Sequence, residues 1–280
     1  AATKRELGLD PELSFQMPEE LVAATQDYAR RRGQLLKEEW QLRYDAWATA
    51  NPDGVALLER LRARRLPEGW DRDLDWFEAG TSMATRIASK KVLDAIAETV
   101  PELWGGSADL SGTNGTWGPE LPSVLPPGTT SDEWPGDEFG RVLHFGIREH
   151  GMGSILNGIA LAGLTRVFGA TFLIFSDYMR PAVRLAALMG LPVLYVWTHD
   201  SVAVGEDGPT HQPVEHLWAL RGIPGLQVVR PGDANEVVAA YKHTLENSEG
   251  PVAIALSRQN LPTLGFTEVM AEGVKRGAYV

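Results

Sequence analysis

Short apolar runs rich in β-branched residues alternate with stretches of helical periodicity between about residue 80 and residue 262. The runs are mostly apolar and do not alternate with polar residues, which is typical of strands buried on both faces of a parallel sheet. The predicted strands are residues 142–145, 166–168 with 171–174, 192–198, 226–229 and 252–256. This order predicts an α/β fold, a doubly wound, mostly parallel sheet with helices on both faces. Ligands of such sheets bind beyond the carboxyl ends of the strands, so we expect the chemistry there.

Helices are predicted between these strands. Residues 81–99 carry one apolar face at helical spacing, formed by Ala84, Ile87, Ala88, Val92, Ala95 and Ile96. A second helix is predicted at residues 233–245. Asp233 is its expected N-cap, because a carboxylate there accepts hydrogen bonds from the first turn.

Residues 1 to about 75 predict a helical extension that precedes the sheet. Pro18 followed by Glu19 and Glu20 is typical of a first helical turn, where acidic side chains stabilise the positive end of the dipole. Asn51-Pro52 ends this helix, and a shorter helical run reaches Pro67. The longer helix carries an apolar stripe of Leu21, Tyr28, Leu35, Leu36, Trp40, Tyr44 and Trp47. Helices without a sheet must bury such a stripe against the next domain or against sequence that this chain lacks.

Charge and cysteine content exclude several classes of function. The formal net charge is −11, from 37 acidic and 26 basic side chains, which disfavours binding to nucleic acid and to anionic membranes. No stretch approaches the roughly 18 apolar residues of a membrane span, and the charged start has no apolar signal core. With no cysteine, disulfides and thiolate chemistry are excluded. We expect a cytoplasmic protein, and the missing initiator methionine is expected of a fragment or a processed chain.

Two motifs with an obvious chemical interpretation are too incomplete to use. Gly151 and Gly153 hint at a dinucleotide site, but the next glycine is Gly158, which is too late for the fingerprint. The three histidines 199, 211 and 216 have no zinc-motif spacing and no accompanying cysteine. Histidines that pack in the core or contact substrate are the better interpretation.

Four segments at or after predicted strand ends carry the candidate functional groups. Glu149 lies at a predicted helix start between glycines, where it either caps the helix or meets a ligand. Phe172, Phe175 and Tyr178 recur every three residues, and they form either a box for a flat ring or ordinary core. Residues 198–201 and 205–213 hold more hydrogen-bonding groups than a surface loop requires, and a plain surface loop is the alternative. Arg258 suits a sugar phosphate or a carboxylate, because its guanidinium binds bidentately, and a salt bridge is the alternative.

In this order the segments resemble the transketolase family. The matching runs are G-I-R-E-H-G-M from Gly146, T-H-D-S from Thr198, G-E-D-G-P-T-H-Q-P from Gly205, S-R-Q-N-L-P from Ser257, A-T-R from Ala84 and G-S-A-D-L from Gly106. The resemblance implies three parts. Residues 1–78 would be the helical tail of the preceding diphosphate-binding domain. Residues 79–262 would be the central pyrimidine-binding domain. Residues 263–280, where we predict no helix or strand, would be a linker to a missing C-terminal domain.

The resemblance implies thiamine diphosphate as cofactor, bound between the two subunits of a homodimer. Glu149 would hydrogen-bond the pyrimidine ring nitrogen and so help the neighbouring amine to remove the thiazolium proton. Phe172, Phe175 and Tyr178 would surround the pyrimidine. Asp109 and Leu110 would make further cofactor contacts.

The implied reaction is transfer of a two-carbon ketol unit from a ketose phosphate to an aldose phosphate, in the pentose phosphate pathway. His211 would lie near the reacting oxygens, and Asp207 would bind a sugar hydroxyl. The substrate phosphate would be held by Arg86, Thr113, His199 and Arg258. The family often has serine where Thr113 stands, and threonine keeps the hydroxyl.

One family motif is absent from this sequence. The family binds Mg²⁺ or Ca²⁺ through G-D-G and a later asparagine, and this sequence contains no G-D-G. The metal ligands are therefore expected from the missing N-terminal domain, and this chain alone is expected to be inactive. The alternatives are a catalytically silent, transketolase-like assembly subunit, or a related enzyme such as dihydroxyacetone synthase or deoxyxylulose-phosphate synthase.

Overall fold

The computed structural model describes the chain apart from residues 16, 117, 119–121, 133, 248, 278 and 280. The chain divides into two compact units, Ala1–Leu58 and Glu59–Val280. No helix in the described part of the chain has both the length and the apolar character needed to cross a membrane.

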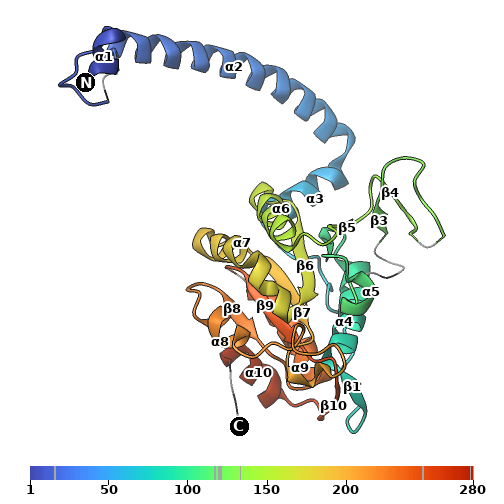
Figure 1. Cartoon of the computed structure of the whole chain (residues 1–280). Helices are drawn as coiled ribbons and strands as arrows, with labels where there is room; N and C mark the ends of the chain where they lie inside the picture. Colours follow the sequence, from blue (N-terminus) through green and yellow to red (C-terminus); the bar gives the residue numbers. More distant parts are fainter. Residues whose placement is uncertain are drawn as a thin grey trace. The chain divides into compact units, whose positions relative to one another are not determined.

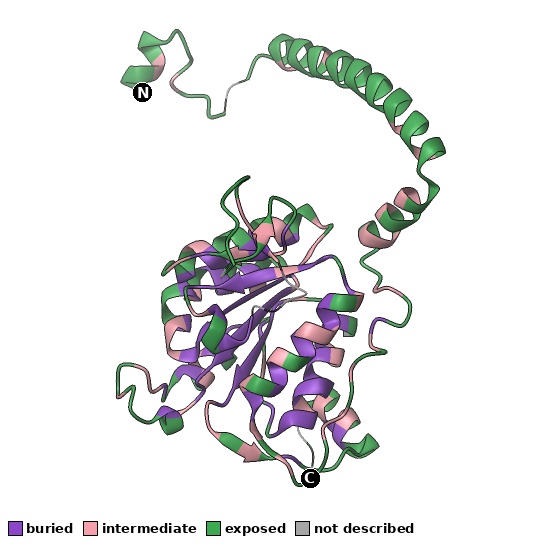
Figure 2. Cartoon of the chain, turned by 90° about the vertical axis from the view of Figure 1, so that its right-hand side faces the viewer, coloured by how far each residue is buried: buried purple, intermediate pink, exposed green. Residues whose placement is uncertain are grey.

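The first unit is helical, as the sequence predicts. It contains α1 (Ala2–Glu6), the long α2 (Glu19–Ala50) and the start of α3 (Pro52–Arg62). The break between α2 and α3 falls at Asn51, as predicted. No residue of α2 is buried, and Figure 2 shows the helix exposed along its length. Within its apolar stripe the Trp40 and Tyr44 rings stack with centroids 5.0 Å apart.

The second unit is built on an eight-stranded sheet in the order β4-β3-β5-β2-β6-β7-β9-β8, and all its neighbouring strands are parallel. The strands are β2 (Leu103–Ser107), β3 (Ser123–Val124), β4 (Gly136–Asp137), β5 (Val142–His144), β6 (Arg166–Phe172), β7 (Val193–Thr198), β8 (Gln227–Val229) and β9 (Val252–Leu256). A separate antiparallel pair joins β1 (Ser82–Ala84) to β10 (Asn260–Pro262). The predicted α/β class with a mostly parallel sheet is confirmed.

Helices cover both faces of this sheet (Figure 1). One core packs α4 (Thr85–Thr99) and α9 (Ala234–Asn247) against Phe168, Val196 and Ile254. The other packs α6 (Glu149–Ala162) and α7 (Ser176–Met189) against the strand residues that alternate with these, such as Val167 and Trp197. Successive strand side chains point to opposite faces, so continuous apolar runs supply both cores at once.

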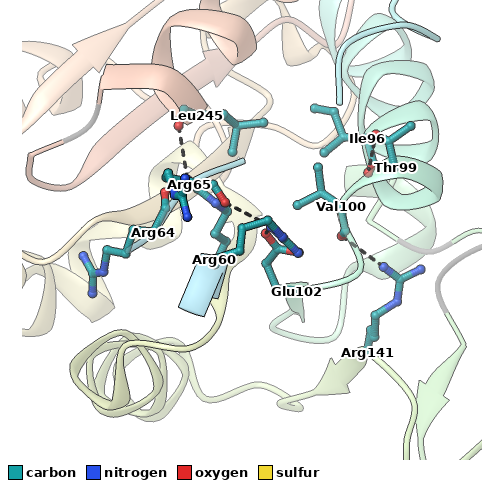
Figure 3. A network of polar contacts seen from close by, with 10 residues as sticks. Arg60, Arg64, Arg65, Ile96, Thr99, Val100, Glu102, Arg141 and Leu245 are labelled. Atoms are coloured by element: carbon teal, nitrogen blue, oxygen red, sulfur yellow. Dashed lines mark hydrogen bonds and ion pairs between the residues drawn. The ribbon is translucent and has the colours of Figure 1, made fainter. Parts of the chain in front are cut away.

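The amino ends of the strands are tied to the chain that leaves α3. Figure 3 shows Arg60 facing Glu102, with Nη1 and Nη2 donating to the two carboxylate oxygens at 2.6 and 3.0 Å. Arg166, the first residue of β6, donates to the carbonyl oxygens of Leu245 and Arg64. Burial is the main cause that lowers the pKa of Arg166. These contacts fix where the segment before the sheet meets the sheet.

Two helix starts show how well local signals predicted boundaries. The Asp233 Oδ1 accepts a hydrogen bond from the Glu236 N–H at 2.8 Å, so the expected N-cap of α9 is confirmed. The helix predicted at 81–99 begins instead at Thr85, because residues 82–84 pair with β10 as a strand. That pairing depends on residues far along the chain and has no local signal.

The segment after residue 262 differs from the sequence expectation. Residues 263–280 were expected to contain no regular element, but α10 spans Glu268–Arg276. The Thr267 side chain caps it by accepting from the Met270 N–H at 3.0 Å, and Met270 is buried. The helix packs on α9. The glycines of residues 263–280 are typical of a linker. Within α10, however, the Thr267 cap and the burial of Met270 stabilise the helix by more than its one glycine destabilises it.

Candidate active site

The sequence-derived site residues lie at or beyond the carboxyl ends of neighbouring strands. Asp109, Leu110 and Thr113 follow β2, and Glu149 follows β5. The aromatic segment begins at the end of β6, His199 follows β7, and Arg258 follows β9. Because these strands are parallel neighbours, their ends meet along one edge of the sheet. Five segments distant in sequence thus contribute to one region.

Aromatic and imidazole rings cluster where β6 and β7 end. The Phe172 ring lies 3.7 Å from the His199 ring at an interplanar angle of 26°. The Phe175 ring is nearly parallel to Phe172, at 5.8 Å and 8°. His211 meets Phe175 edge-on at 5.3 Å, and Tyr178 lies 6.1 Å from Phe175. The predicted three-residue spacing of the aromatic residues therefore produces a set of flat walls with two imidazoles beside it.

His199 is almost fully buried and has a left-handed backbone, with φ of 61°. Burial lowers the pKa of its imidazole to about 4, and the positive charges of Arg86 and Arg258 act in the same direction. Asp207 opposes this lowering of the pKa. The ring is therefore neutral at pH 7.

Arg86 and Arg258 are brought together by a reciprocal pair of hydrogen bonds between the residues that precede them. The Ser257 N–H donates to the Thr85 Oγ1 at 2.7 Å, and the Thr85 N–H donates to the Ser257 Oγ at 3.0 Å. Burial, and then the charge of Arg258, lowers the pKa of Arg86. Two like charges held next to a neutral imidazole favour an anion between them.

The two guanidiniums keep donors available for such an anion. The Arg86 Nη1 donates to the Thr113 carbonyl oxygen at 3.0 Å, and the buried Arg86 Nε has no partner among the described residues. Arg258 pairs with Glu206 at 2.6 Å, and the Glu206 side chain is 77% exposed. Arg86 thus contacts the backbone of Thr113 and not the hydroxyl that the family resemblance implicates.

Glu149 is the first residue of α6 and is buried. Within the described part of the chain its carboxylate makes no hydrogen bond and no ion pair, so it caps no helical N–H there. Of the two interpretations from sequence, a plain helix cap is thus unsupported. A buried carboxylate without a partner costs stability, which is typical of a group kept for a ligand.

A cavity of about 440 Å³ adjoins this region. Arg86, Asp109, Leu110 and Thr113 line it together with His144. Asp109 has a left-handed backbone with φ of 63°, as His199 does. Such conformations are uncommon outside glycine and cluster at functional sites. The loop after β2 and the Arg86 side chain thus line the same cavity.

Sequence reasoning missed a chain of buried polar groups behind His199. Ser107, Asn114 and Thr198 are each at most 1% exposed. The Asn114 Nδ2 donates to the Ser107 Oγ at 2.9 Å, and the Thr198 Oγ1 donates to the Asn114 Oδ1 at 2.7 Å. The Thr198 Oγ1 also lies 2.8 Å from the His199 Nδ1. The only sequence signal was that these residues fall inside or beside the matching runs.

His216 is separate from the two site histidines. Its Nε2 lies 3.1 Å from the Asp177 Oδ2, and Glu215 lies on the other side of the ring. Among the described residues these three are the one group whose potential ligand atoms could hold a metal ion. His199 and His211 are not part of it, so the three histidines do not form a common zinc set.

Comparisons with known proteins agree with this architecture. A family model described as "Transketolase, pyrimidine binding domain" matches residues 81–263, and "Transketolase, thiamine diphosphate binding domain" matches residues 1–67. The chain is 54% identical to a transketolase of Mycobacterium bovis over 283 residues, covering 100% of this chain and 40% of that protein. It is 49% identical to a transketolase of Geobacillus stearothermophilus, covering 95% and 39%. The chain thus spans about 40% of the length of the curated relatives it matches.

Solved structures show the same likeness. A Pichia stipitis transketolase in complex with xylulose-5-phosphate superimposes with a TM-score of 0.88 at 41% identity, over 99% of this chain and 40% of that one. The transketolase of Leishmania mexicana gives 0.86 at 37% identity, over 99% and 39%.

Proposed function

The chain belongs to the transketolase family, and from this premise we propose that it supplies the pyrimidine-binding half of a thiamine-diphosphate site. The site would move a two-carbon ketol unit from a ketose phosphate to an aldose phosphate. The observation that carries the proposal is the placement of two guanidiniums, Arg86 and Arg258, beside His199 and the rings stacked on it. A phosphate anchor next to flat apolar walls suits a sugar phosphate that reacts at a heterocyclic cofactor.

The residues present fit the pyrimidine part of this cofactor. Glu149 offers a buried carboxylate without a partner among the described residues, and the Phe172 and Phe175 rings offer parallel walls. When bound, thiamine diphosphate supplies the nucleophile that carries the two-carbon unit. Glu149 would hold a proton at the pyrimidine nitrogen. Phe172, Phe175 and Tyr178 would exclude water, and Asp109 and Leu110 would bound the cofactor.

The remaining site residues would bind and orient the sugar phosphate. Arg86, Arg258, His199 and Thr113 would surround the phosphate group, with the two guanidiniums supplying charge-assisted hydrogen bonds. His211, which lies edge-on to Phe172 at 6.1 Å, would contact the oxygens near the reacting carbon. Asp207, which acts electrostatically on His199, would bind a sugar hydroxyl.

The diphosphate and a divalent metal, Mg²⁺ or Ca²⁺, would be held by a preceding domain of the partner subunit in a homodimer. We propose residues 1–78 as the tail of such a domain, 79–262 as the pyrimidine-binding domain, and 263–280 as the connection, now with α10 in it, to a following domain. The residues matched by the two family models support this division. A cytoplasmic role in pentose phosphate metabolism is part of the same proposal.

Reconstitution tests the proposal. The chain is combined with a separately produced diphosphate-binding domain, thiamine diphosphate and Mg²⁺, and ketol transfer from xylulose-5-phosphate to an aldose phosphate is assayed. We expect activity that Glu149→Ala lowers about 10²- to 10⁴-fold, the range for loss of a proton-transfer group. His150→Ala, at the exposed neighbouring position, is the matched control and should keep normal activity.

The outcomes separate the alternatives. Normal activity of the Glu149→Ala enzyme would reject the role of this carboxylate. A stable complex that binds cofactor but transfers no ketol unit would favour a silent assembly subunit.

A further inference from the structure

A chain of buried hydrogen bonds runs from Ser107 at the end of β2 through Asn114 to Thr198 at the end of β7, next to His199. Ser107 and Thr198 are the last residues of β2 and β7, and Asn114 is the last residue of α5 (Ser111–Asn114). All three side chains are buried, so water cannot replace any of these hydrogen-bond partners. None of the three has a role in the proposed reaction.

Ser107 determines which atoms donate and which accept along this chain of hydrogen bonds. Its Oγ accepts from the Leu110 N–H at 3.2 Å and from the Asn114 Nδ2 at 2.9 Å. Its proton goes to the Ala170 carbonyl oxygen at 3.0 Å, so the hydroxyl has used its one donor and both acceptor sites.

The direction then propagates to the histidine. The Asn114 Nδ2 donates to Ser107, so its Oδ1 faces Thr198 and accepts the Thr198 hydroxyl proton at 2.7 Å. The Thr198 Oγ1 has then no proton left for the ring, and it must accept at its 2.8 Å contact with the His199 Nδ1. The opposite direction would require the Asn114 amide to turn over and the Ser107 hydroxyl to leave the Ala170 carbonyl.

We propose that Ser107, Asn114 and Thr198 act as positioning residues that hold His199 in the neutral Nδ1–H tautomer, so that its Nε2 lone pair faces the ligand and binding of a phosphate ester takes up a proton at this nitrogen. This inference rests on the proposed function for the identity of the ligand. Its statement about the tautomer does not.

The charges around the ring explain why the proton arrives with the ligand. Burial is the main cause that disfavours a proton on His199 before ligand enters. The charges of Arg86 from α4, Arg258 after β9 and His211 act in the same direction, and the charge of Asp207 favours the proton. An Nε2 lone pair repels a phosphate dianion. When the dianion arrives, its charge offsets those of the two arginines, and a proton from solvent placed between Nε2 and a phosphate oxygen turns the repulsion into a charge-assisted hydrogen bond.

The tautomer is measured without any ligand. The full chain is labelled with ¹⁵N-histidine, the His199 signals are assigned by their loss in His199→Gln, and nitrogen chemical shifts at about pH 7.5 identify which ring nitrogen carries the proton. We expect Nδ1–H in the unmodified chain and in Thr198→Ser, which keeps the hydroxyl. Thr198→Val, which has nearly the same shape but no acceptor, should shift the ring toward the Nε2–H form.

Proton uptake is measured by calorimetry with inorganic phosphate as the probe, at about pH 8, in buffers of different ionisation enthalpy. We expect protons to be taken up when phosphate binds the unmodified chain, and close to none for His199→Gln. Thr198→Val should bind phosphate roughly tenfold more weakly, and Thr198→Ser should restore the affinity.

The two measurements separate the possible failures. An Nε2–H ring in the unmodified chain, or a tautomer that Thr198→Val leaves unchanged, would overturn the inference whatever the ligand is. The expected tautomer with no phosphate binding would contradict the proposed phosphate site and the proton uptake, and leave the positioning role intact. Binding without proton uptake would overturn the proton-uptake part.

Discussion

At the scale of single residues, His199 couples the site to pH. Its pKa is lowered in the folded chain to about 4, whereas an unfolded histidine titrates near its model value of 6.5. Between these values the unfolded chain binds more protons, so the stability contributed by the neutral ring is complete above about pH 6.5 and is lost as pH falls toward about 4.

This gives a measurable cost in stability. The free energy of unfolding should fall by about 2 kcal/mol from this residue between about pH 7.5 and pH 5. Urea unfolding at both pH values measures it, with His199→Gln as the comparison, since glutamine does not titrate. An equal pH dependence in the two proteins would show that His199 is not the group responsible.

Arg258 gives a prediction for substrate recognition. In the reconstituted enzyme, Arg258→Ala should raise the KM for a ketose phosphate about 10- to 100-fold, the effect of one lost charge-assisted hydrogen bond. A ketose without phosphate should react equally well with both enzymes. Glu206→Gln frees Arg258 from its ion pair, so its KM for the phosphate ester should be unchanged or lower. A similar loss with both ketoses would place the effect of Arg258 outside phosphate binding.

The part of the candidate site that follows the strand ends could be predicted from the sequence. Glu149 at a helix start and the three-residue spacing of Phe172, Phe175 and Tyr178 are local patterns, and the structure has both. The hydrogen bonds that join Ser107, Asn114 and Thr198 could not be predicted, because these residues belong to three different elements that become neighbours only after the sheet has formed. The individual roles of the site residues remain predictions.

At the scale of elements, the strands that sequence predicted are those with continuous apolar runs. β9 has the bounds predicted for it, and β5, β7 and β8 differ by one residue. β6 was predicted as two pieces, which is wrong, because Gly169 interrupts the apolar pattern but not the strand. A Cβ at Gly169 would lie 2.3 Å from the Leu156 Cδ1, so the glycine allows α6 to approach the sheet.

β2 was not predicted, although it lies in the middle of the sheet. Its sequence is L-W-G-G-S, and glycine argues against a strand. A Cβ at Gly105 would lie 2.2 Å from the Phe168 carbonyl oxygen, and one at Gly106 would lie 1.9 Å from the Leu143 carbonyl oxygen. The glycines are thus required by the neighbouring strands β6 and β5, and this requirement is tertiary.

The junction between α3 and β2 gives a prediction at this scale. Glu102 is buried and Arg60 is its bidentate partner, so removing the arginine leaves a buried carboxylate without its charge partner. Arg60→Met should lower the free energy of unfolding by about 2 kcal/mol, measured by urea unfolding. Arg62→Met on the same helix is exposed and should change it by less than about 0.5 kcal/mol.

A double-mutant cycle isolates this ion pair. Arg60→Met combined with Glu102→Gln should cost less than the sum of the single changes, because the double variant has no unpaired buried charge. Strict additivity would mean that the two side chains do not stabilise each other.

At the scale of the whole molecule, the chain holds one part of the proposed active site and lacks the family's metal motif. We therefore expect the purified chain alone to bind thiamine diphosphate weakly and to show no ketol transfer. Isothermal calorimetry with the cofactor and Mg²⁺, followed by the transfer assay, measures both. Turnover by the chain alone would contradict the division of the site between two domains.

The pairing of β1 with β10 has a further consequence. The Gly80 N–H donates to the Thr263 carbonyl oxygen at 2.9 Å, and the Thr263 N–H donates to the Thr81 carbonyl oxygen at 2.8 Å. The segment matched by the pyrimidine-binding family model therefore begins and ends at neighbouring positions, and backbone hydrogen bonds join its two ends. A module with adjoining ends is suited to circular permutation and to grafting into an unrelated host loop, since neither operation would stretch its interior.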